Sequence, residues 1–374
     1  MYFKISRNKL SELISVASKA ISPNSPIASL SGIKFDIYQD SIELTGSDND
    51  ISIKVSAKKG DDFTYEVKET GSIVINKNYI TEIIRKIDSD IVEIEVTDGN
   101  LAKITGNAAM FEINGYSAGE YPLIDFTEPE KKFNIEGKVL KKLVDQTYFA
   151  TSVQEARPAL SGINFSCDPS GLRVVATDSY RLAKKKLELG IPYDFNVTIL
   201  AKSLIDISRT FAEQDKISFA LSEQKAQFRS ENTVIQTRLI EGTYPDTSKF
   251  VPNSFDYELI FSSKDLLKAL DSFAFMKNEN DQFAIVKLNL SSSEIIMSAK
   301  SQEIGSAVVK LPFDEYKGES LEISFSAKYM QEAVSGLGSE KIKIRFAGAM
   351  KPFVLTAIDD NTSLQLVLPV RTFN

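Results

Sequence analysis

Residues 31–35 read Ser-Gly-Ile-Lys-Phe, and residues 161–165, which lie 130 positions further along the chain, read Ser-Gly-Ile-Asn-Phe. The same offset separates Gly46-Ser47-Asp48 from Ala176-Thr177-Asp178. Self-similarity at a fixed offset indicates that one structural unit occurs more than once in a chain. We therefore expect copies of a domain of about 130 residues.

Two further patterns recur in the same order and extend the repeat to three copies. Paired leucines open each copy in an amphipathic segment, at Leu10 and Leu13, Leu140 and Leu143, and Leu267 and Leu270. A strand running into a short helix carries a lysine in each copy, at Lys77, Lys202 and Lys328. The counterpart of residues 31–35 in the last third is a weaker alternating run over residues 285–290. Any one of these matches could arise by chance, but several matches in the same order at nearly constant spacing are hard to produce that way. We therefore favour a triplication.

Each copy combines several alternating strands with two helical segments at fixed places. Val92-Glu93-Ile94-Glu95-Val96 shows the alternation that is typical of a half-buried strand. Because the helices do not lie between successive strands, we predict an α+β fold of antiparallel sheets with helices packed on one face. A chain of 374 residues is too long for one core. Turn signals at residues 119–122 and 242–245 help to place the domains at residues 1–127, 128–250 and 251–374.

The composition excludes several classes of site. The chain has no histidine and one cysteine, Cys167, which excludes Ser-His-Asp catalysis, His-ligated zinc and an internal disulfide. No Gly-rich nucleotide loop, signal peptide or membrane-length apolar run is present. We therefore expect no catalytic residue, metal or cofactor, no membrane partner, and a location in the reducing cytoplasm.

The acidic residues leave one alternative open. The pairs Asp48/Asp50 and Asp359/Asp360 have the chemistry to bind a hard cation, as an enzyme would require. Asp48 recurs at the repeat spacing as Asp178, which favours a role in a turn instead.

The positive charge is concentrated in the predicted helices although the net charge is -7. Six helix windows together hold 15 Lys and Arg against 8 Asp and Glu, at residues 7–22, 76–88, 137–151, 201–211, 263–277 and 327–337. If the helices share one surface, that surface attracts phosphates while the rest repels them. The alternative is that Lys and Arg simply favour solvated helix faces.

Three motifs carry a resemblance to a known family that extends over the whole chain. They are Ala176-Thr177-Asp178-Ser179-Tyr180-Arg181-Leu182, Gly242-Thr243-Tyr244-Pro245-Asp246 and Leu368-Pro369-Val370-Arg371. With the triplication and the basic helices, they make the chain resemble the bacterial DNA polymerase III beta subunit, the beta sliding clamp. The resemblance implies three DNA-clamp domains per chain and a head-to-tail homodimeric ring, with antiparallel sheets outside and paired helices lining the inner face.

The resemblance also implies a function without catalysis. Members of this family are processivity factors that encircle double-stranded DNA topologically and without sequence specificity. They tether the DNA polymerase, the clamp loader and repair proteins through short linear motifs that bind a pocket between the second and third domains. Weak, salt-screened phosphate contacts suit such a sliding ring.

The resemblance assigns residues to three surfaces. The partner-peptide pocket takes Leu160, Thr177, Ser179, Tyr180, Arg181, Leu182, Pro245, Lys249, Phe250, Met350, Pro352, Leu368, Pro369, Val370 and Arg371. The DNA-facing candidates are Lys77, Lys138, Lys141, Lys142, Gln154, Arg157, Lys202, Arg209, Lys264 and Lys268. The dimer interface pairs Phe111 and Ile113, on an edge strand, with Phe275 and Met276 of a second copy.

The chemistry of the pocket residues suits peptide capture. Its Leu, Pro, Val, Phe and Met side chains make an apolar groove, and Thr177, Arg181 and Arg371 are expected to fix polar groups of a peptide. Tyr180 stands where the family often has histidine, and Lys249 stands where arginine is common, so partner preference is expected to differ in detail. A monomeric peptide-binding scaffold without ring closure remains a second alternative.

Overall fold

The computed structural model describes residues 1–22, 25–48, 50–60, 62–154, 157–276, 283–301 and 303–371. The chain divides into two compact units, one formed by Met1–Val139 with Asp206–Leu239 and the other by Leu140–Ile205 with Ile240–Asn374. Within the described residues, no helix is long and apolar enough to cross a membrane.

The first unit contains two antiparallel sheets. The five-stranded sheet has the order β5 (Tyr65–Glu69), β1 (Tyr2–Ser6), β7 (Ile91–Thr97), β8 (Leu101–Gly106) and β9 (Ala109–Asn114). The nine-stranded sheet has the order β10 (Tyr116–Ser117), β6 (Gly71–Asn76), β2 (Gly32–Ile37), β3 (Ser41–Ser47), β4 (Ile51–Lys58), β18 (Thr233–Arg238), β17 (Lys225–Arg229), β16 (Lys216–Leu221) and β11 (Lys131–Glu136). The pair β4–β18 joins strands of the first two repeats into one sheet.

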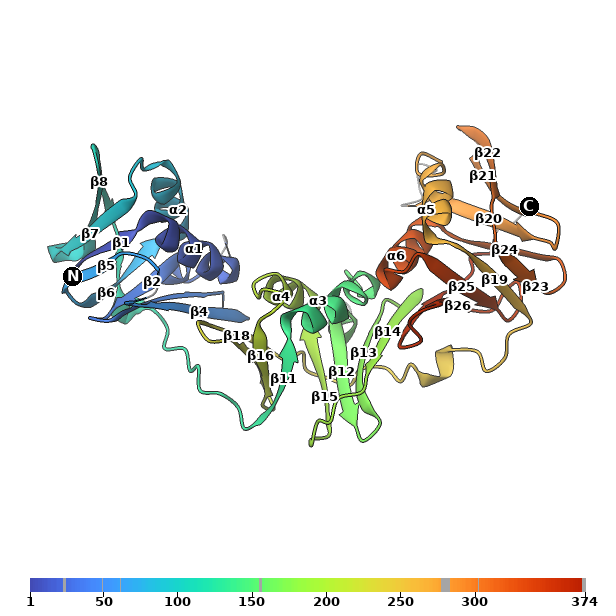
Figure 1. The fold of residues 1–374 in the computed structure, drawn as a ribbon, viewed down its shortest axis with the longest axis horizontal. Helices are drawn as coiled ribbons and strands as arrows, with labels where there is room; N and C mark the ends of the chain where they lie inside the picture. The colour runs from blue at the N-terminus through green and yellow to red at the C-terminus, as the bar shows by residue number, and fades with distance from the viewer. Residues whose placement is uncertain are drawn as a thin grey trace. The chain divides into compact units, whose positions relative to one another are not determined.

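Helices α1 (Arg7–Ala17) and α2 (Lys77–Lys86) bury their apolar faces in the core of the first unit (Figure 1). Leu10 and Leu13, the predicted pair, are both buried there. Arg7 donates from Nε to the carbonyl of Ile84 at 2.9 Å and from Nη2 to that of Arg85 at 2.8 Å. The cation thus satisfies carbonyls at the negative end of α2.

The second unit also contains two antiparallel sheets. Its nine-stranded sheet has the order β15 (Phe195–Leu200), β12 (Gly162–Asp168), β13 (Gly171–Thr177), β14 (Arg181–Leu187), β27 (Ser363–Val367), β26 (Phe353–Ala357), β25 (Lys341–Phe346), β19 (Tyr257–Ser262) and β23 (Glu315–Lys317). Its four-stranded sheet has the order β22 (Gly305–Leu311), β21 (Ile295–Ser301), β20 (Ile285–Leu290) and β24 (Leu321–Ser326). The pair β14–β27 joins strands of the second and third repeats.

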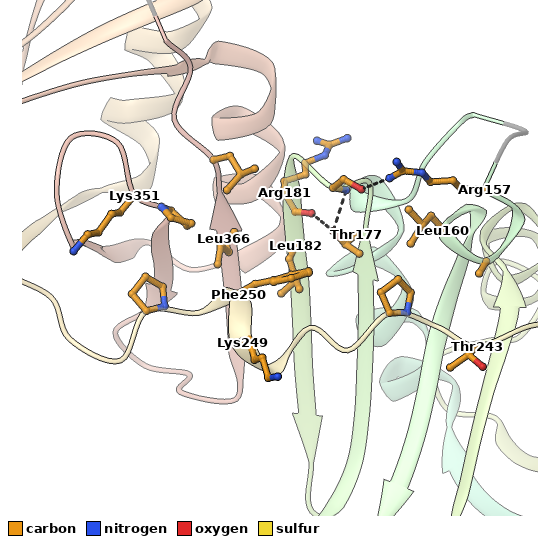
Figure 2. Close-up of a pocket in the computed structure, with 16 residues that line it drawn as sticks. Arg157, Leu160, Thr177, Arg181, Leu182, Thr243, Lys249, Phe250, Lys351 and Leu366 are labelled. Carbon is orange, nitrogen blue, oxygen red and sulfur yellow. Dashed lines mark hydrogen bonds between the residues drawn. The ribbon is translucent and has the colours of Figure 1, made fainter.

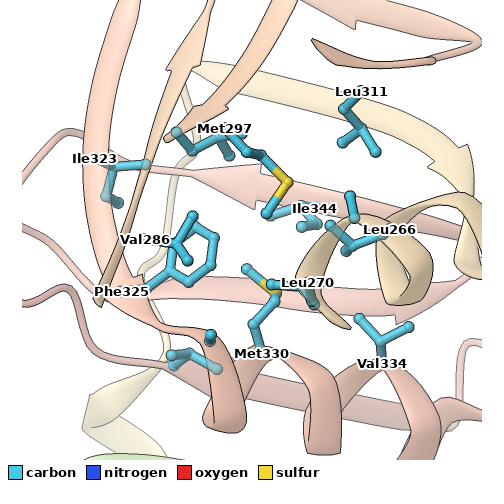
Figure 3. Packing of buried hydrophobic residues seen from close by; sticks show 14 of the residues in the cluster. Leu266, Leu270, Val286, Met297, Leu311, Ile323, Phe325, Met330, Val334 and Ile344 are labelled. Carbon is cyan, nitrogen blue, oxygen red and sulfur yellow. The ribbon is translucent and has the colours of Figure 1, made fainter. Parts of the chain in front are cut away.

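Helices α5 (Ser263–Asp271) and α6 (Ala327–Leu337) pack on the largest core of the second unit. Figure 3 shows Leu266 and Leu270 of α5 and Met330 of α6 facing Phe325 and Val286 of the sheets. With α3 (Gly137–Asp145) and α4 (Ala201–Ser208), the described residues form six α-helices, two for each repeat. The predicted α+β class with mostly antiparallel sheets is confirmed.

The recurring Ser-Gly-Ile stretch marks the same junction in two repeats. Gly32 opens β2 opposite Asn76, and Gly162 opens β12 opposite Leu200, directly before helices α2 and α4. A Cβ atom on Gly162 would lie 2.6 Å from Thr198 Cγ2 and 2.8 Å from the carbonyl oxygen of Ile199. The third copy of the junction, Ile285 opposite Ser326, does without glycine, which explains its weaker sequence signal.

We expect Gly162→Ala to lower the free energy of unfolding by about 1–3 kcal/mol, because the methyl group meets backbone that has little room to move. Thermal denaturation followed by circular dichroism measures the effect. Gly190→Ala is the matched control, since its Cβ would have no neighbour within 4 Å. Equal melting temperatures for the two variants would contradict the close-approach explanation.

Candidate functional site

A cavity of about 890 Å³ lies within the second unit. It is bounded by the turn between β13 and β14, the end of β27 and the segment that leads from the second repeat into the third (Figure 2). Its lining residues are Arg157, Ala159, Leu160, Thr177, Ser179, Arg181, Leu182, Thr243, Pro245, Lys249, Phe250, Pro252, Lys351, Pro352, Leu366 and Leu368. The size and the mostly apolar lining suit a few apolar side chains of a ligand.

The floor of the cavity is a small apolar cluster. Leu160, Leu182 and Leu366 are buried together there, and Leu368 packs against them. Phe250 remains 44% exposed above this floor, so part of its ring is free for a ligand. Apolar grooves can bind extended peptides through alternate side chains, or helical peptides through side chains three or four residues apart.

The turn between β13 and β14 is held by hydrogen bonds inside residues 177–181. Asp178 Oδ1 accepts from the amides of Tyr180 at 2.9 Å and Arg181 at 3.0 Å. Thr177 Oγ1 donates to the carbonyl of Arg181 at 2.6 Å. Ser179 has a φ of 79°, a left-handed conformation that costs a serine about 1 kcal/mol or more. The surrounding bonds therefore fix one wall of the cavity in a strained conformation.

The equivalent turn of the first repeat uses the same bonds. Asp48 Oδ1 accepts from the amides of Asp50 at 3.1 Å and Ile51 at 3.0 Å. The predicted turn role of Asp48 and Asp178 is confirmed. No group of three or more His, Cys, Asp or Glu able to hold a metal ion occurs in the part of the chain that the structure describes.

Tyr244, in the second Gly-x-Tyr-Pro motif, supports the same turn. Its hydroxyl accepts from the amide of Thr177 at 2.9 Å, and its side chain is buried beneath the cavity. Burial raises the pKa of Tyr244 well above its ordinary value, so the phenol stays neutral. Tyr121, its counterpart in the first repeat, is also buried and also has a raised pKa.

Arg181 lines the cavity, but its guanidinium is engaged within the protein. Nε donates to Asp178 at 3.0 Å, Nη1 donates to Glu332 of α6, and Nη2 donates to the carbonyl of Phe149. The guanidinium also stacks 4.3 Å from the ring centre of Tyr329, and the residue is only 8% exposed. These partners lie in helix α6 and in the segment around Phe149. The expectation that Arg181 fixes polar groups of a peptide stays a prediction, and the contacts favour a role in positioning the cavity wall.

Ten of the fifteen predicted pocket residues line the cavity, and five do not. The five outside the lining are Tyr180, Met350, Pro369, Val370 and Arg371. Tyr180 instead stacks on Tyr329, with ring centres 6.5 Å apart. The backbone beyond β27 is fixed on two sides, because the amide of Leu368 donates to Tyr180 at 3.0 Å and that of Val370 donates to Ser324 at 2.7 Å.

Six lining residues were missing from the predicted pocket: Arg157, Ala159, Thr243, Pro252, Lys351 and Leu366. Arg157 had been assigned to the DNA-facing surface, yet its Nη1 donates to Ser179 Oγ at 3.0 Å at the cavity wall. Thr243 lies inside the Gly-Thr-Tyr-Pro motif, and Leu366, on β27, lies two residues before the predicted Leu368. Both positions therefore carried a usable signal.

The other DNA-facing candidates are mostly exposed and mostly lie on helices. Lys138, Lys202 and Lys264 are each the second residue of their helix and are exposed. A cation in this position opposes the helix dipole, so helix stability does not account for it. The remaining candidates are the half-buried Lys77 and the exposed Lys141, Lys142, Gln154, Arg209 and Lys268. Gln154 lies on a loop.

Acidic partners are seen for Lys138 and Lys142 in the described part of the chain. Lys138 pairs with Glu136 at 2.6 Å, and Lys142 pairs with Asp360 at 3.3 Å.

The predicted dimer residues fall into two groups. Phe111 and Ile113 lie on the edge strand β9 and are half-buried against the core of the first unit. Phe275 is 61% exposed just after α5, whereas Met276 is 4% exposed within the core of the second unit. Met276 therefore packs in its own core, and the interface prediction rests on the other three.

Three family models match the chain in succession. They are the N-terminal domain of the DNA polymerase III beta subunit at residues 1–125, the central domain at residues 134–246 and the C-terminal domain at residues 248–371. The beta sliding clamp of Bacillus subtilis (strain 168) is 38% identical over 379 residues, and the match covers 100% of both chains. That of Halalkalibacterium halodurans is 34% identical over 380 residues, again with 100% of both covered.

Solved structures give the same result. The crystal structure of the DNA polymerase sliding clamp from Bacillus subtilis has a TM-score of 0.95 at 36% identity, with 100% of both chains covered. The beta subunit from the DNA polymerase of Streptococcus pyogenes has a TM-score of 0.94 at 29% identity, also with 100% covered. Because sequence and fold agree along the full length, the chain belongs to the DNA polymerase III beta subunit family, the sliding clamps, which serve DNA replication as processivity factors without a catalytic centre.

Proposed function

We propose that the protein acts in the cytoplasm as a dimeric ring that encircles duplex DNA and tethers replication and repair proteins to it. Two copies close head to tail, each contributing three clamp domains at residues 1–127, 128–250 and 251–374. The ring stays on DNA because it is closed, so it needs no tight contact with any sequence.

The observation that carries this proposal is that two of the sheet edges, β9 in the first unit and β22 in the second, expose apolar side chains. An exposed edge strand with apolar side chains is a template for pairing with another chain. Met110 on β9 is 58% exposed and Val308 on β22 is 68% exposed. Glu112 and Lys310, on the same two strands, have opposite charge. Head-to-tail pairing of β9 with β22 of a second copy buries the apolar residues and closes a two-membered ring.

The basic helix residues support a weak hold on DNA. Exposed lysines at the starts of α3, α4 and α5 provide cations that suit contact with phosphates. Contacts with phosphates carry no information about the base sequence. Contacts of this kind neutralise phosphates, weaken with salt and allow sliding. The apolar cavity of the second unit supports the tethering, since polymerase, clamp loader and repair proteins need only share a short apolar segment to dock there.

Loading onto circular and linear DNA tests the ring. We expect the loaded protein to remain on circular duplex in high salt and to leave a linear duplex over its ends. Equal loss from both DNAs would contradict topological closure. A measured turnover on DNA or nucleotides would favour the enzyme alternative.

Val308→Asp is expected to weaken dimerisation about tenfold or more, which is roughly 1.4 kcal/mol, because a carboxylate replaces an apolar contact at the closed edge. Light scattering at micromolar concentration measures the mass. Leu123→Asp is the control, because Leu123 is 102% exposed and lies on no sheet edge. If both variants stay dimeric, the β9–β22 joint is wrong, and a monomeric wild type would favour the scaffold alternative.

A further inference from the structure

The mouth of the cavity is positively charged although the protein is acidic. Of the described residues that line the cavity, none is Asp or Glu. Arg157, Lys249 and Lys351 all line it and are all exposed, in a chain whose net charge is -7. Cations that gather at one opening against the overall charge indicate selection for a particular ligand charge.

Among the described residues, the carboxylates near the cavity form no ion pair with these three cations. Asp178 and Glu332 are both bound to the guanidinium of Arg181. Asp246 accepts from the amide of Ser248 at 2.9 Å. That bond is the main cause of the lowered pKa of Asp246, and the charge of Lys249 adds only a smaller part. Lys249 is exposed and forms no ion pair with Asp246, so its ammonium is accessible to a ligand.

The cations surround the apolar floor and do not form one cluster. Figure 2 shows Lys351 at one end of the groove, Arg157 at the other end, and Lys249 beside Phe250 between them. A ligand that fills the floor with apolar side chains would present its preceding and following residues to these cations. The arrangement thus fits charge on both flanks of an apolar centre.

We infer that the pocket selects peptide segments whose apolar centre is flanked on both sides by Asp or Glu. This rests on the proposed docking function and names the chemistry of the partner segment. Carboxylates on the flanks steer the segment toward the groove, whereas basic flanks are repelled. A single-stranded nucleic acid is also anionic, but it needs several aromatic platforms for its bases, and among the described lining residues Phe250 alone is aromatic.

Three synthetic peptides with one shared core of Leu and Phe test the inference on the full chain. Their flanks carry Asp, Asn or Lys on both sides, and fluorescence anisotropy measures their affinities. We expect the Asp peptide to bind about three- to tenfold tighter than the Asn peptide, the effect of a few exposed charge pairs. The Lys peptide is expected to bind weakest, and high salt is expected to close the gaps.

A double charge reversal, Lys249→Glu with Lys351→Glu, should invert the order so that the Lys peptide binds best. Both side chains are exposed, so folding is expected to survive. Lys59→Glu makes the same kind of change at an exposed lysine of the first unit and should leave the order as it is.

Three outcomes would overturn the inference. Equal binding of all peptides by the wild type overturns it but leaves the groove as a docking site. Binding of none overturns the docking function as well. Displacement of the Asp peptide by a single-stranded oligonucleotide at a lower concentration than by unlabelled peptide assigns the charged mouth to nucleic acid.

Discussion

Replacing Asp360 by Ala is expected to lower the free energy of unfolding of the second unit by about 3–5 kcal/mol, the cost of leaving a buried charge without its partner. Lys185 on β14 is 2% exposed, and its Nζ lies 2.6 Å from Asp360 Oδ2 and 2.9 Å from Ser363 Oγ. Removal of the carboxylate leaves the ammonium buried beside a single hydroxyl. Urea denaturation of wild type and variant measures the difference.

The neighbouring residue provides the control. Asp359 is exposed and accepts from Ser339 Oγ at 2.7 Å, so Asp359→Ala is expected to cost no more than about 1 kcal/mol. In the Asp360→Ala background, Lys185→Met removes the stranded charge and should recover most of the lost stability. Equal effects at positions 359 and 360, or no recovery by Lys185→Met, would show that the buried pair does not hold β14 against β27.

The same pair predicts a dependence on pH. Burial alone would raise the pKa of Asp360, but hydrogen bonds from Lys185 and from the hydroxyl and amide of Thr362 hold that pKa well below its ordinary value. A carboxyl whose pKa is lower in the folded state stabilises the fold above its unfolded pKa of about 4 and loses this contribution as the pH falls through the folded pKa. The stability gap between wild type and Asp360→Ala should therefore be full at neutral pH and shrink below about pH 4, as urea titrations at several pH values would reveal.

The fate of Lys185 illustrates what the sequence leaves open. In the run Lys184-Lys185-Lys186 nothing distinguishes the middle residue, and strand alternation only assigns it to one face. Its burial depends on Asp360, which lies 175 positions further along the chain, and on strand β27, which follows Asp360. The repeats, the α+β class and the Asp178 turn were predictable because each depends on local pattern or on comparison of the chain with itself.

The pocket was predictable only in part, and through the family resemblance. Leu182 and Pro245 lie in two of the motifs that carry this resemblance, and Leu160 was assigned together with them. Leu366 and Lys351 enter the cavity only because β14 pairs with β27. The contacts of Arg181 could not be predicted for the same reason, since its partner Glu332 is 151 positions away. A motif can indicate that a residue lies near a pocket, but the hydrogen-bond partners of its side chain depend on segments that are distant in the sequence.

Arg181→Ala is expected to lower the free energy of unfolding by about 3 kcal/mol and to weaken peptide binding about tenfold, because the arginine positions the cavity wall without touching the ligand. Its loss leaves Asp178, 11% exposed, without a counter-ion and frees the strained turn at Ser179 from helix α6. Arg181→Lys should rescue little, since one ammonium cannot replace three divergent bonds. Denaturation and anisotropy on the same protein measure both effects.

A positioning role and a ligand role give different results for the Arg181 variant. If Arg181 only positions the cavity wall, its loss should weaken the binding of acidic and neutral peptides by the same factor. If Arg181 contacts the ligand, its loss should weaken the binding of the acidic peptide alone. Ser179→Gly supplies a second test, because glycine adopts a φ of 79° without strain and should restore part of the affinity in the Arg181→Ala background. Arg157→Ala is the contrasting variant, since the side chain of Arg157 is exposed and, among the described residues, its guanidinium donates to Ser179 Oγ. Arg157→Ala should reduce the preference for acidic flanks with little change in the free energy of unfolding. If instead Arg181→Ala alone reduced this preference and Arg157→Ala alone lowered stability, Arg181 would contact the ligand and Arg157 would support the wall.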